Sequence, residues 1–409
     1  MVEREIFFSR GRSISLSYSN KALKRREDIS SEGYGIRVVE NGGLGFSYAE
    51  TRNDVEKSTQ IAKNLAKYSP RPKFSFPEKK DYPRIKLEDE KIKQMDAKEL
   101  KGIFEKVKEG AEKYSGNAQI SIGIDSDYIS IENTGGFSGE CETTSIQAGV
   151  EVMDENGFGF FSNAFSSIPD IDEFYKIGEL AAERAKETKN PRKIDSGTYV
   201  VVFEPEALDD LMDVLLPSFS GDWKKRKISY LHDKIGQSVF SEKLSIHDNP
   251  LMEEGVNSQP FDDEGVPSEK ITIIDKGIAK NFIYNVEVAS LEGVSEKGRC
   301  SRPSYDSMPG IGFSNIVVDP GDLSEDEGDI SVVSFHGAHT SNTTTGDFGI
   351  EVNSAFLTKN GKREPIRDFM ITGNIFKLFK NIYGIGKRQR KLGTFFAPRI
   401  AFSDVQVVG

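Results

Sequence analysis

Three carboxylates stand side by side in the segment Phe-Asp-Asp-Glu-Gly-Val-Pro: Asp262, Asp263 and Glu264. Neighbouring carboxylates bind Mg²⁺ or Ca²⁺ in some proteins and act as general acid and base in others. Acidic residues before Gly-Val-Pro are also typical of a tight connection, in which Asp side chains accept hydrogen bonds from backbone amides. The segment therefore has two interpretations, a chemical site and a structural turn, and the structural turn is the commoner of the two.

Metal chemistry would depend on histidines and carboxylates, because two cysteines, Cys141 and Cys300, cannot build a thiolate cage. His336 and His339 lie at the end of an expected strand, so both reach one ion only if a loop bends and a third ligand comes from elsewhere. Local hydrogen bonding is the more common role of such histidines. A self-sufficient metal-dependent peptidase that uses His336, His339 and the carboxylates 262–264 remains an alternative.

A third polar segment is Thr-Thr-Thr-Gly-Asp-Phe at 343–348. Its hydroxyls and exposed amides could line a peptide or anion site, although polar turns select the same residues. No phosphate-binding glycine loop opens a helix after a strand, and order and context reveal no Ser-His-Asp or Cys-His arrangement. Nucleotide binding and nucleophilic catalysis are therefore not indicated.

The element that the sequence defines best is a strand followed by a helix over Val200–Gly221. Pro205 suits a first helical position, where its missing N–H would have no partner in any case. Apolar residues then recur with helical spacing and predict one buried face. They are Ala207, Leu208, Leu211, Met212, Leu215 and Leu216. The helix has no histidine and no cysteine, which bears directly on metal binding.

The composition is that of a soluble globular protein with two or more domains, since the chain has 409 residues, 36% of them hydrophobic and 29% charged. There is no apolar run of about 18 residues, and the start lacks the basic flank and apolar core of a signal peptide. The small number of cysteines favours a reducing compartment. A cytoplasmic protein without a membrane span is therefore expected.

The net charge of −11 disfavours general binding to nucleic-acid phosphates. One basic cluster is interleaved with aromatic residues, a pattern that also occurs in nucleic-acid-binding proteins. A solvated helix face and loop explains such a cluster more often, so nucleic acid is not the expected partner. The cluster consists of Lys377, Lys380, Lys387, Arg388, Arg390 and Lys391.

The N-terminal part predicts strands, turns and helices in alternation. Residues 5–48 alternate like strands around an Asn-Gly hairpin turn, and a helix is expected over 54–68. Residues 69–90 are rich in proline and lysine and predict an extended crossing, which leads to a helix over 96–114. Strands return over 119–124 and 128–131.

The segment 149–160 aligns without gaps on 35–46, and a helix follows each copy, the second over 171–189. The identical residues are Gly, Val, Gly, Gly and Phe, in that order. We infer a duplicated hairpin-plus-helix unit over 14–68 and 119–189. Two unrelated hairpins that share turn chemistry are the alternative.

A polar linker over 190–197 is the best domain boundary. Beyond it, strands dominate and helices are few. Runs of strands interrupted by a few helices favour an α+β fold over an alternating parallel sheet. We therefore predict an N-terminal α+β domain over 1–190 and a mainly antiparallel β domain with a few helices over 198–409.

Five motifs follow one another in the C-terminal half. They are Val-Val-Phe-Glu-Pro-Glu-Ala (201–207), Phe-Asp-Asp-Glu-Gly-Val-Pro (261–267), Asp-Pro-Gly-Asp-Leu (319–323), Gly-Ala-His-Thr-Ser-Asn-Thr-Thr-Thr-Gly-Asp-Phe (337–348) and Ala-Pro-Arg-Ile (397–400). With Glu-Gly-Tyr-Gly-Ile-Arg-Val at 32–38, they extend over nearly the whole chain. In these motifs the chain resembles the TldD/PmbA family, also called the modulator of DNA gyrase family, and more closely its PmbA/TldE-like branch.

The resemblance implies a subunit of a cytoplasmic zinc metalloprotease, in which a TldD-type chain pairs with a TldE-type chain and degrades or trims peptides. The TldD-type chain carries His-Glu-x-x-x-His on a helix, where the histidines bind zinc and the glutamate activates water. An ungapped placement sets Asp213, Val214 and Ser218 at these three positions, and they cannot replace the motif as a set. The resemblance therefore implies a non-catalytic chain without zinc, and zinc in its partner.

The implied role is to dock a TldD-like chain in a heterodimer and to help enclose an unfolded peptide, in the manner of an added strand. A homodimer in the absence of that partner stays open, and so does a nucleic-acid- or gyrase-associated regulator. Residues in two loops are nominated for peptide binding or for the interface. They are His339, Asn342, Thr345, Gly346, Asp347, Asp262, Asp263 and Glu264.

Overall fold

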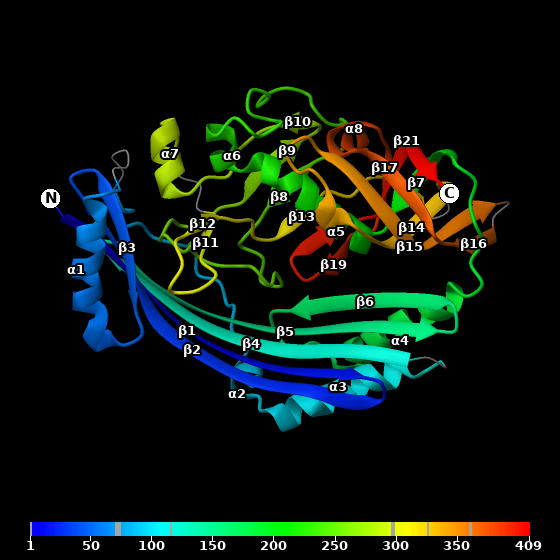
Figure 1. Ribbon diagram of the computed structural model, residues 1–409, viewed down its shortest axis with the longest axis horizontal. Coiled ribbons are helices and arrows are strands. Elements are labelled where there is room, and N and C mark those ends of the chain that lie inside the picture. The colour runs from blue at the N-terminus through cyan, green and yellow to red at the C-terminus, as the bar shows by residue number, and fades with distance from the viewer. Residues whose placement is uncertain (1, 70–74, 115–116, 296–298, 325–326, 360–361) are drawn as a thin grey trace.

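The computed structural model describes residues 2–69, 75–114, 117–295, 299–324, 327–359 and 362–409. It has a mixed α+β fold with mostly antiparallel strands, as predicted. Figure 1 shows a long curved sheet with helices on its convex side and a β-rich part above its concave side. Within the described ranges, the helices are too short or too polar to cross a membrane.

The N-terminal sheet has six antiparallel strands in the order β3-β2-β1-β4-β5-β6. They are β1 (Val2–Ser19), β2 (Ala22–Glu40), β3 (Gly43–Ala49), β4 (Asn117–Asn133), β5 (Ser138–Asp154) and β6 (Gly157–Phe165). The helices of this part are α1 (Val55–Ala66), α2 (Glu90–Gln94), α3 (Ala97–Ala111) and α4 (Ile171–Glu187). Helices α2 and α3 lie below the sheet in Figure 1, α4 packs against α3, β5 and β6, and α1 packs against β2 and β3.

The sheet has two different faces because apolar and small polar residues alternate along its strands. On β1, Ile14 and Leu16 are buried in the core that α3 and α4 complete. Ser13, Ser15 and Ser17 alternate with them and therefore point to the opposite, concave face. The helices cover one face, and the concave face keeps short polar side chains.

The hairpin β2–β3 with α1 and the hairpin β5–β6 with α4 have the same construction. In each unit, two glycines of the second strand lie against the carbonyls of two alanines in the following helix. The pairs are Gly43 with Ala66, Gly45 with Ala62, Gly157 with Ala185 and Gly159 with Ala181. A β-carbon at any of these glycines would lie 1.8 or 2.0 Å from the alanine carbonyl oxygen. Each helix therefore approaches its strand more closely than a residue with a side chain at the glycine position would allow. The common origin of the two units stays a prediction.

The crossing predicted as extended over 69–90 is without helix or long strand where it is described, and its residues 70–74 lie outside the described residues. It ends in the short helix α2, which the sequence pattern does not predict. Asp89 begins α2 by accepting a hydrogen bond of 2.8 Å from the Lys91 amide. A helix of five residues is too short to produce a periodic pattern.

In the C-terminal half, five strands pair into a closed ring in the order β14-β7-β21-β17-β15 and back to β14. The ring strands are β7 (Gly197–Phe203), β14 (Ile330–His336), β15 (Asp347–Lys359), β17 (Phe369–Asn374) and β21 (Ile400–Val408). Two shorter strands extend it: β16 (Lys362–Ile366) pairs with β15, and β18 (Ile382–Ile385) pairs with β21.

A second sheet has the order β10-β9-β8-β13-β20-β19. Its strands are β8 (Ile246–Asp248), β9 (Ile271–Asp275), β10 (Ile278–Ala279), β13 (Ile316–Val318), β19 (Arg390–Leu392) and β20 (Phe395–Ala397). A separate short pair joins β11 (Cys300–Ser301) to β12 (Gly310–Ile311). The remaining helices are α5 (Pro205–Leu215), α6 (Gly221–Lys225), α7 (Val286–Glu292) and α8 (Ile375–Lys380).

Helix α5 lies in the core between the ring and the second sheet. It begins at Pro205 as predicted, and Leu208, Leu211 and Leu215 are fully buried. It contacts β7 and β14 of the ring, β19 and β20 of the second sheet, and α8. A 3₁₀ turn, Leu216–Phe219, ends it. The helix that the sequence defines best is thus the central packing element of this half.

The close approach of α4 to β6 can be tested with Gly159→Ala. A β-carbon there would lie 2.0 Å from the Ala181 oxygen and 2.5 Å from the Ala185 nitrogen, so α4 would have to move outward. We expect the free energy of unfolding to fall by roughly 1–3 kcal/mol. Urea denaturation followed by circular dichroism measures it.

Gly102→Ala is the matched control, because a β-carbon at Gly102 on α3 meets no atom within 4 Å. This change should be neutral or should stabilise the protein by up to about 1 kcal/mol, since alanine is the better helix former. Equal unfolding midpoints for the two variants would contradict the packing described.

Candidate functional site

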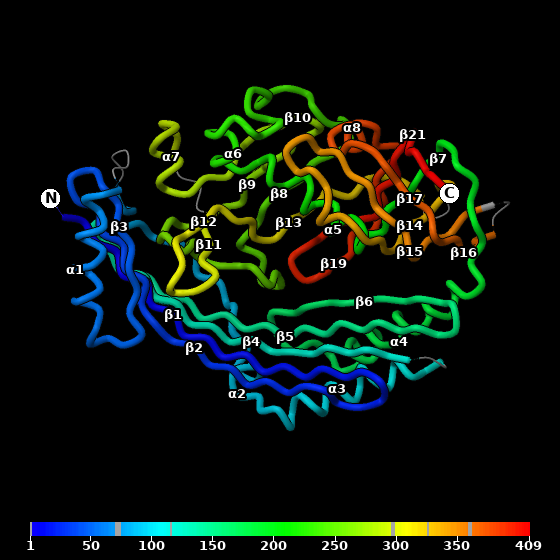
Figure 2. The backbone as a smooth tube through the Cα atoms, in the orientation of Figure 1, coloured from blue at the N-terminus to red at the C-terminus, as the bar shows by residue number. Residues whose placement is uncertain are grey.

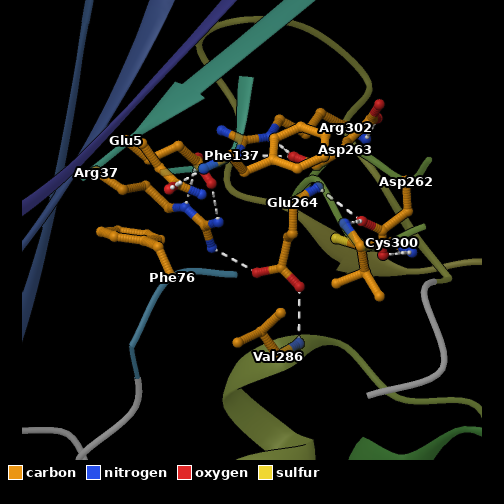
Figure 3. Close-up of polar contacts among 12 residues, drawn as sticks. Glu5, Arg37, Phe76, Phe137, Asp262, Asp263, Glu264, Val286, Cys300 and Arg302 are labelled. Atoms are coloured by element: carbon orange, nitrogen blue, oxygen red, sulfur yellow. Dashed lines mark hydrogen bonds and ion pairs between the residues drawn. The ribbon is translucent and has the colours of Figure 1, made fainter. Parts of the chain in front are cut away.

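The three adjacent carboxylates at 262–264 lie in a buried charge cluster between the two parts of the molecule. The cluster consists of Glu5, Arg37, Asp262, Asp263, Glu264 and Arg302, all at most 8% exposed. Figure 3 shows Glu5 and Arg37 reaching this cluster from the N-terminal strands. Glu5 is on β1 and Arg37 is on β2, so the cluster joins residues that are far apart in sequence.

Arg37 connects the two parts directly. Its Nε donates to Glu5 at 2.9 Å and its Nη2 donates to the other Glu5 oxygen at 2.5 Å. Its Nη1 donates to Glu264 at 2.6 Å, and the second Glu264 oxygen accepts from the Val286 amide at 2.7 Å. Val286 is the first residue of α7, where a carboxylate is favoured by the helix dipole. Both oxygens of Glu264 are therefore engaged.

Asp262 and Asp263 hold the backbone around them. Asp262 accepts from the amides of Glu264 at 3.0 Å, Val266 at 2.9 Å and Cys300 at 3.1 Å. Asp263 accepts from the Arg302 amide at 2.6 Å, and the Arg302 guanidinium returns a bond of 2.9 Å to the Asp263 carbonyl. These contacts correspond to the structural-turn interpretation of the segment, in which Asp side chains accept hydrogen bonds from backbone amides.

The two arginines offset only part of the charge of the four buried carboxylates, and burial together with the neighbouring Glu264 raises the pKa of Asp262 well above its usual value. Burial opposes ionisation of Glu5, yet Arg302 and Arg37 hold the pKa of that carboxyl below its usual value. Burial, only partly offset by Arg302, raises the pKa of Asp263 to about 6. The partners Glu5, Arg37 and Arg302 were not identified from the sequence, although Arg37 lies inside the Glu-Gly-Tyr-Gly-Ile-Arg-Val motif.

The segment around Thr343 forms the connection between β14 and β15. The Asn342 side chain accepts from the amides of Thr344 and Thr345, both at 3.1 Å. Thr345 donates to Asp347 at 2.8 Å, and Asn374 donates to the other Asp347 oxygen at 2.9 Å. Gly346, with a φ of 82°, packs against α8. Asn342, Thr345, Gly346 and Asp347 are thus brought together, and His339 lies in the 3₁₀ turn that precedes them. Among the described residues, the partners of Asp262, Asp263 and Glu264 do not include any of these five.

The histidines are engaged locally or stand alone. His336 ends β14, and its Nε2 lies 2.9 Å from the Asn353 side-chain nitrogen. His339 lies in the 3₁₀ turn Ala338–Thr340. The ring nitrogens of His247 contact Thr272 and Asp319 at 3.0 and 3.2 Å. Among the residues that the structure describes, no three His, Cys, Asp or Glu side chains are arranged to hold a metal ion.

The three positions that the sequence placement compares with a zinc motif differ in exposure. Val214 and Ser218 are buried at 1% and 0% exposure, and the Ser218 hydroxyl has no hydrogen-bond partner among the described residues. Asp213 lies on the exposed face of α5. Asp209 and Asp210 lie on the same face, one turn before it, so the open side of α5 carries three carboxylates.

This acidic face was not identified from the sequence. Its signal was available, since residues one turn apart on a helix share a face. Partial burial and the neighbouring carboxylates of Asp210 and Asp213 raise the pKa of Asp209 to about 7. Burial also raises the pKa of Asp210 and Asp213, although His336 opposes the shift at Asp210.

The basic cluster near the C-terminus is partly engaged in ion pairs. Arg390 donates to both oxygens of Glu206, at 2.8 and 3.2 Å, and Arg184 of α4 donates to the same carboxylate. Lys391 lies 3.8 Å from Glu254, and burial lowers the pKa of its ammonium. Lys377 belongs to α8. Two of the six predicted members are therefore bound by acidic groups.

We expect Arg37→Met to lower the free energy of unfolding by about 3–5 kcal/mol, because it leaves Glu264 buried without its arginine and removes one of the two arginines that pair with Glu5. Arg25→Met is the matched control, since it breaks an exposed pair with Glu27 on the β1–β2 hairpin and should change little. Chemical denaturation measures both. An Arg37→Met protein as stable as Arg25→Met would show that the charge cluster does not hold the two parts together.

The acidic face of α5 predicts a pH-dependent gain for Asp209→Asn. The pKa of Asp209 is about 7 in the folded protein and 3.8 for an ordinary aspartate. Ionisation of this carboxyl therefore lowers the free energy of unfolding as the pH rises between these two values. The variant should therefore gain roughly 0.5 kcal/mol above about pH 7, and this gain should vanish toward about pH 4. Denaturation across this pH range tests it. Glu105→Gln, an exposed carboxylate of α3, controls for the loss of one charge, and a pH-independent difference would refute the coupling.

Comparisons with known proteins agree with this architecture. A family model described as the PmbA/TldA metallopeptidase C-terminal domain matches residues 196–409, and the model of domain 1 of the same metallopeptidases matches 5–66. An uncharacterised protein of Methanocaldococcus jannaschii is 29% identical over 98% of this chain and 95% of its own length. Metalloprotease PmbA of Escherichia coli O157:H7 is 24% identical over 99% of this chain and 92% of its own.

Among solved structures, TldE from Thermococcus kodakarensis superposes with a TM-score of 0.91 and 25% identity. The match covers 100% of this chain and 97% of that one. The family model alone extends over more than half of the chain, and the relatives cover nearly all of it. The sequence resemblance is thereby confirmed, and the chain belongs to the PmbA/TldD family of metallopeptidases.

Proposed function

We propose that this chain is the zinc-free, TldE-like subunit of a two-component metalloprotease. In this role it docks a TldD-like chain that holds the zinc ion and helps to enclose an unfolded peptide. The observation that carries the proposal is the chemistry of α5 and of the 3₁₀ turn Leu216–Phe219 that follows it and contains Ser218. Val214 and Ser218 are buried in the core, and Asp213 is the one residue of the three that faces solvent.

A zinc site of this kind would need two imidazoles five residues apart and a carboxylate base next to the first of them. A buried valine offers neither a ligand nor a base, and a buried serine hydroxyl is a poor ligand for zinc. The core around α5 is continuous on this side, because Val214 packs in the same apolar cluster as Leu211 and Leu215. The helix therefore supports a packing role in place of a catalytic one.

The likeness to TldE over the full length of both chains also supports a partner role. The heterodimer with a TldD-like chain, the peptide substrate and the cytoplasmic location are parts of the same proposal. Both cysteines are unpaired and buried, in keeping with a reducing compartment. Burial raises the pKa of the Cys141 thiol to about 12, so it is no ready nucleophile.

Co-purification and activity measurements test the proposal. We expect the purified chain alone to bind far less than one zinc ion and to show no peptidase activity, whereas a mixture with a TldD-like chain binds zinc and cleaves unfolded peptides. Replacing the glutamate of the TldD-like motif by glutamine should abolish the activity of the mixture, because that residue activates the attacking water.

The opposite result is equally clear. Stoichiometric zinc and peptidase activity in the isolated chain, both lost in His336→Ala or His339→Ala, would favour a self-sufficient metalloenzyme. Salt-sensitive DNA binding that disappears when residues 387–391 are neutralised would favour a nucleic-acid- or gyrase-associated regulator. Either outcome would overturn the partner role.

A further inference from the structure

The concave face of the N-terminal sheet is lined by small and polar side chains where β2, β1, β4 and β5 lie side by side. The strand register places Ser31, Gly11, Asp127 and Thr143 in one row across these strands. The next row consists of Gly33, Ser9, Ile129 and Cys141. Because most of these side chains are short, a ligand on this face comes close to the strand backbone.

Loops of the C-terminal half form a roof above these rows. In Figure 2 the loop between β11 and β12 lies against the concave face of β1 and β2. The Tyr305 ring of this loop lies directly over Gly33, where a β-carbon would be 2.4 Å from it. Between floor and roof lies a hollow of about 360 Å³, with Asn257, Gln259 and Ser304 in its roof.

This hollow continues at one end. A second hollow of about 220 Å³ shares Thr143, Asn257 and Gln259 with it. The two hollows together form one groove, which runs between the sheet and the roof loops. A continuous groove of this kind suits an extended chain better than a compact small molecule.

Neutral hydrogen-bonding groups line the middle of the groove. The carboxamides of Asn257 and Gln259 have no hydrogen-bond partner among the described residues, and the same holds for the hydroxyls of Ser9 and Thr143. A carboxamide offers one acceptor and two donor hydrogens, the complement of a peptide group. The groove can therefore pair with the backbone of an extended peptide.

Asp127 is the anionic group that the floor presents to the larger of the two hollows. Its Oδ1 lies over Gly11, 2.6 Å from where a β-carbon would stand. The cation that lines the same hollow, Arg302, has other partners: it pairs with Glu5 and donates to the Asp263 carbonyl at 2.9 Å. Asp127 has no cation of its own among the described residues.

We propose that this groove binds an extended peptide, with Asn257 and Gln259 pairing with peptide groups and Asp127 receiving a lysine or arginine side chain. The inference rests on the proposed function, because it names the surface that would hold the enclosed peptide and the residue type preferred there. A charge-assisted hydrogen bond between a guanidinium and a carboxylate supplies the selectivity. Backbone pairing supplies affinity that does not depend on the peptide sequence.

Fluorescence polarisation of the full chain with two labelled, unstructured peptides tests the inference. The peptides are identical Gly/Ser-rich sequences with one central arginine or one central glutamine. We expect the arginine peptide to bind at least about tenfold more tightly, which corresponds to one charge-assisted bond. Asp127→Asn should remove this difference and leave the weaker binding. Asn257→Ala with Gln259→Ala should weaken both peptides alike.

Glu105→Gln on the convex side removes the same charge outside the groove and should keep the difference. Circular dichroism confirms that each variant is folded. The inference fails if neither peptide binds, or if Asp127→Asn still prefers arginine. The assay needs neither zinc nor a partner, so its failure leaves the subunit proposal standing, and zinc-dependent activity of the isolated chain would defeat that proposal without affecting the binding result.

Discussion

The Arg37 guanidinium lies between two carboxylates that belong to different parts of the molecule. Glu5 comes from the first strand of the N-terminal sheet, and Glu264 comes from a loop of the C-terminal half. Because all three groups are buried, each depends on the others for its charge to be tolerated. This mutual dependence fixes the distance between the sheet and the roof loops, and with it the shape of the groove between them.

A second ionic contact acts at the other end. Glu206, in the first turn of α5, binds Arg184 from α4 and Arg390 from β19. Burial opposes its ionisation, but the two arginines hold its pKa below the usual value. The central helix of the C-terminal half is therefore tied to the N-terminal part as well as to its own core. Buried or partly buried ion pairs at two separate places therefore fix the relative position of the two parts.

Local patterns in the sequence predicted much of the fold. The period of α5, its proline start, and the Asn41-Gly42 turn, whose φ values are 53° and 79°, all follow from short-range rules. The contacts of the buried charge cluster could not be predicted from such rules, because they join residues far apart in the chain. Arg302, for example, binds Glu5 across a separation of 297 residues. Likewise Asp127 and Gln259 line one groove only through strand register and loop placement, which no local pattern contains.

The closed ring of the C-terminal half has a consequence for how the chain is made. Strand β7 begins at Gly197, but its neighbour β21 begins only at Ile400, so ribosomal synthesis supplies the first strand long before the one that seals the ring. Until then β7 and β17 each keep an unpaired edge, which is open to pairing with other chains. Such long-range closure is slow and exposes a nascent chain to aggregation. The N-terminal sheet is made entirely of earlier residues and need not wait for this step.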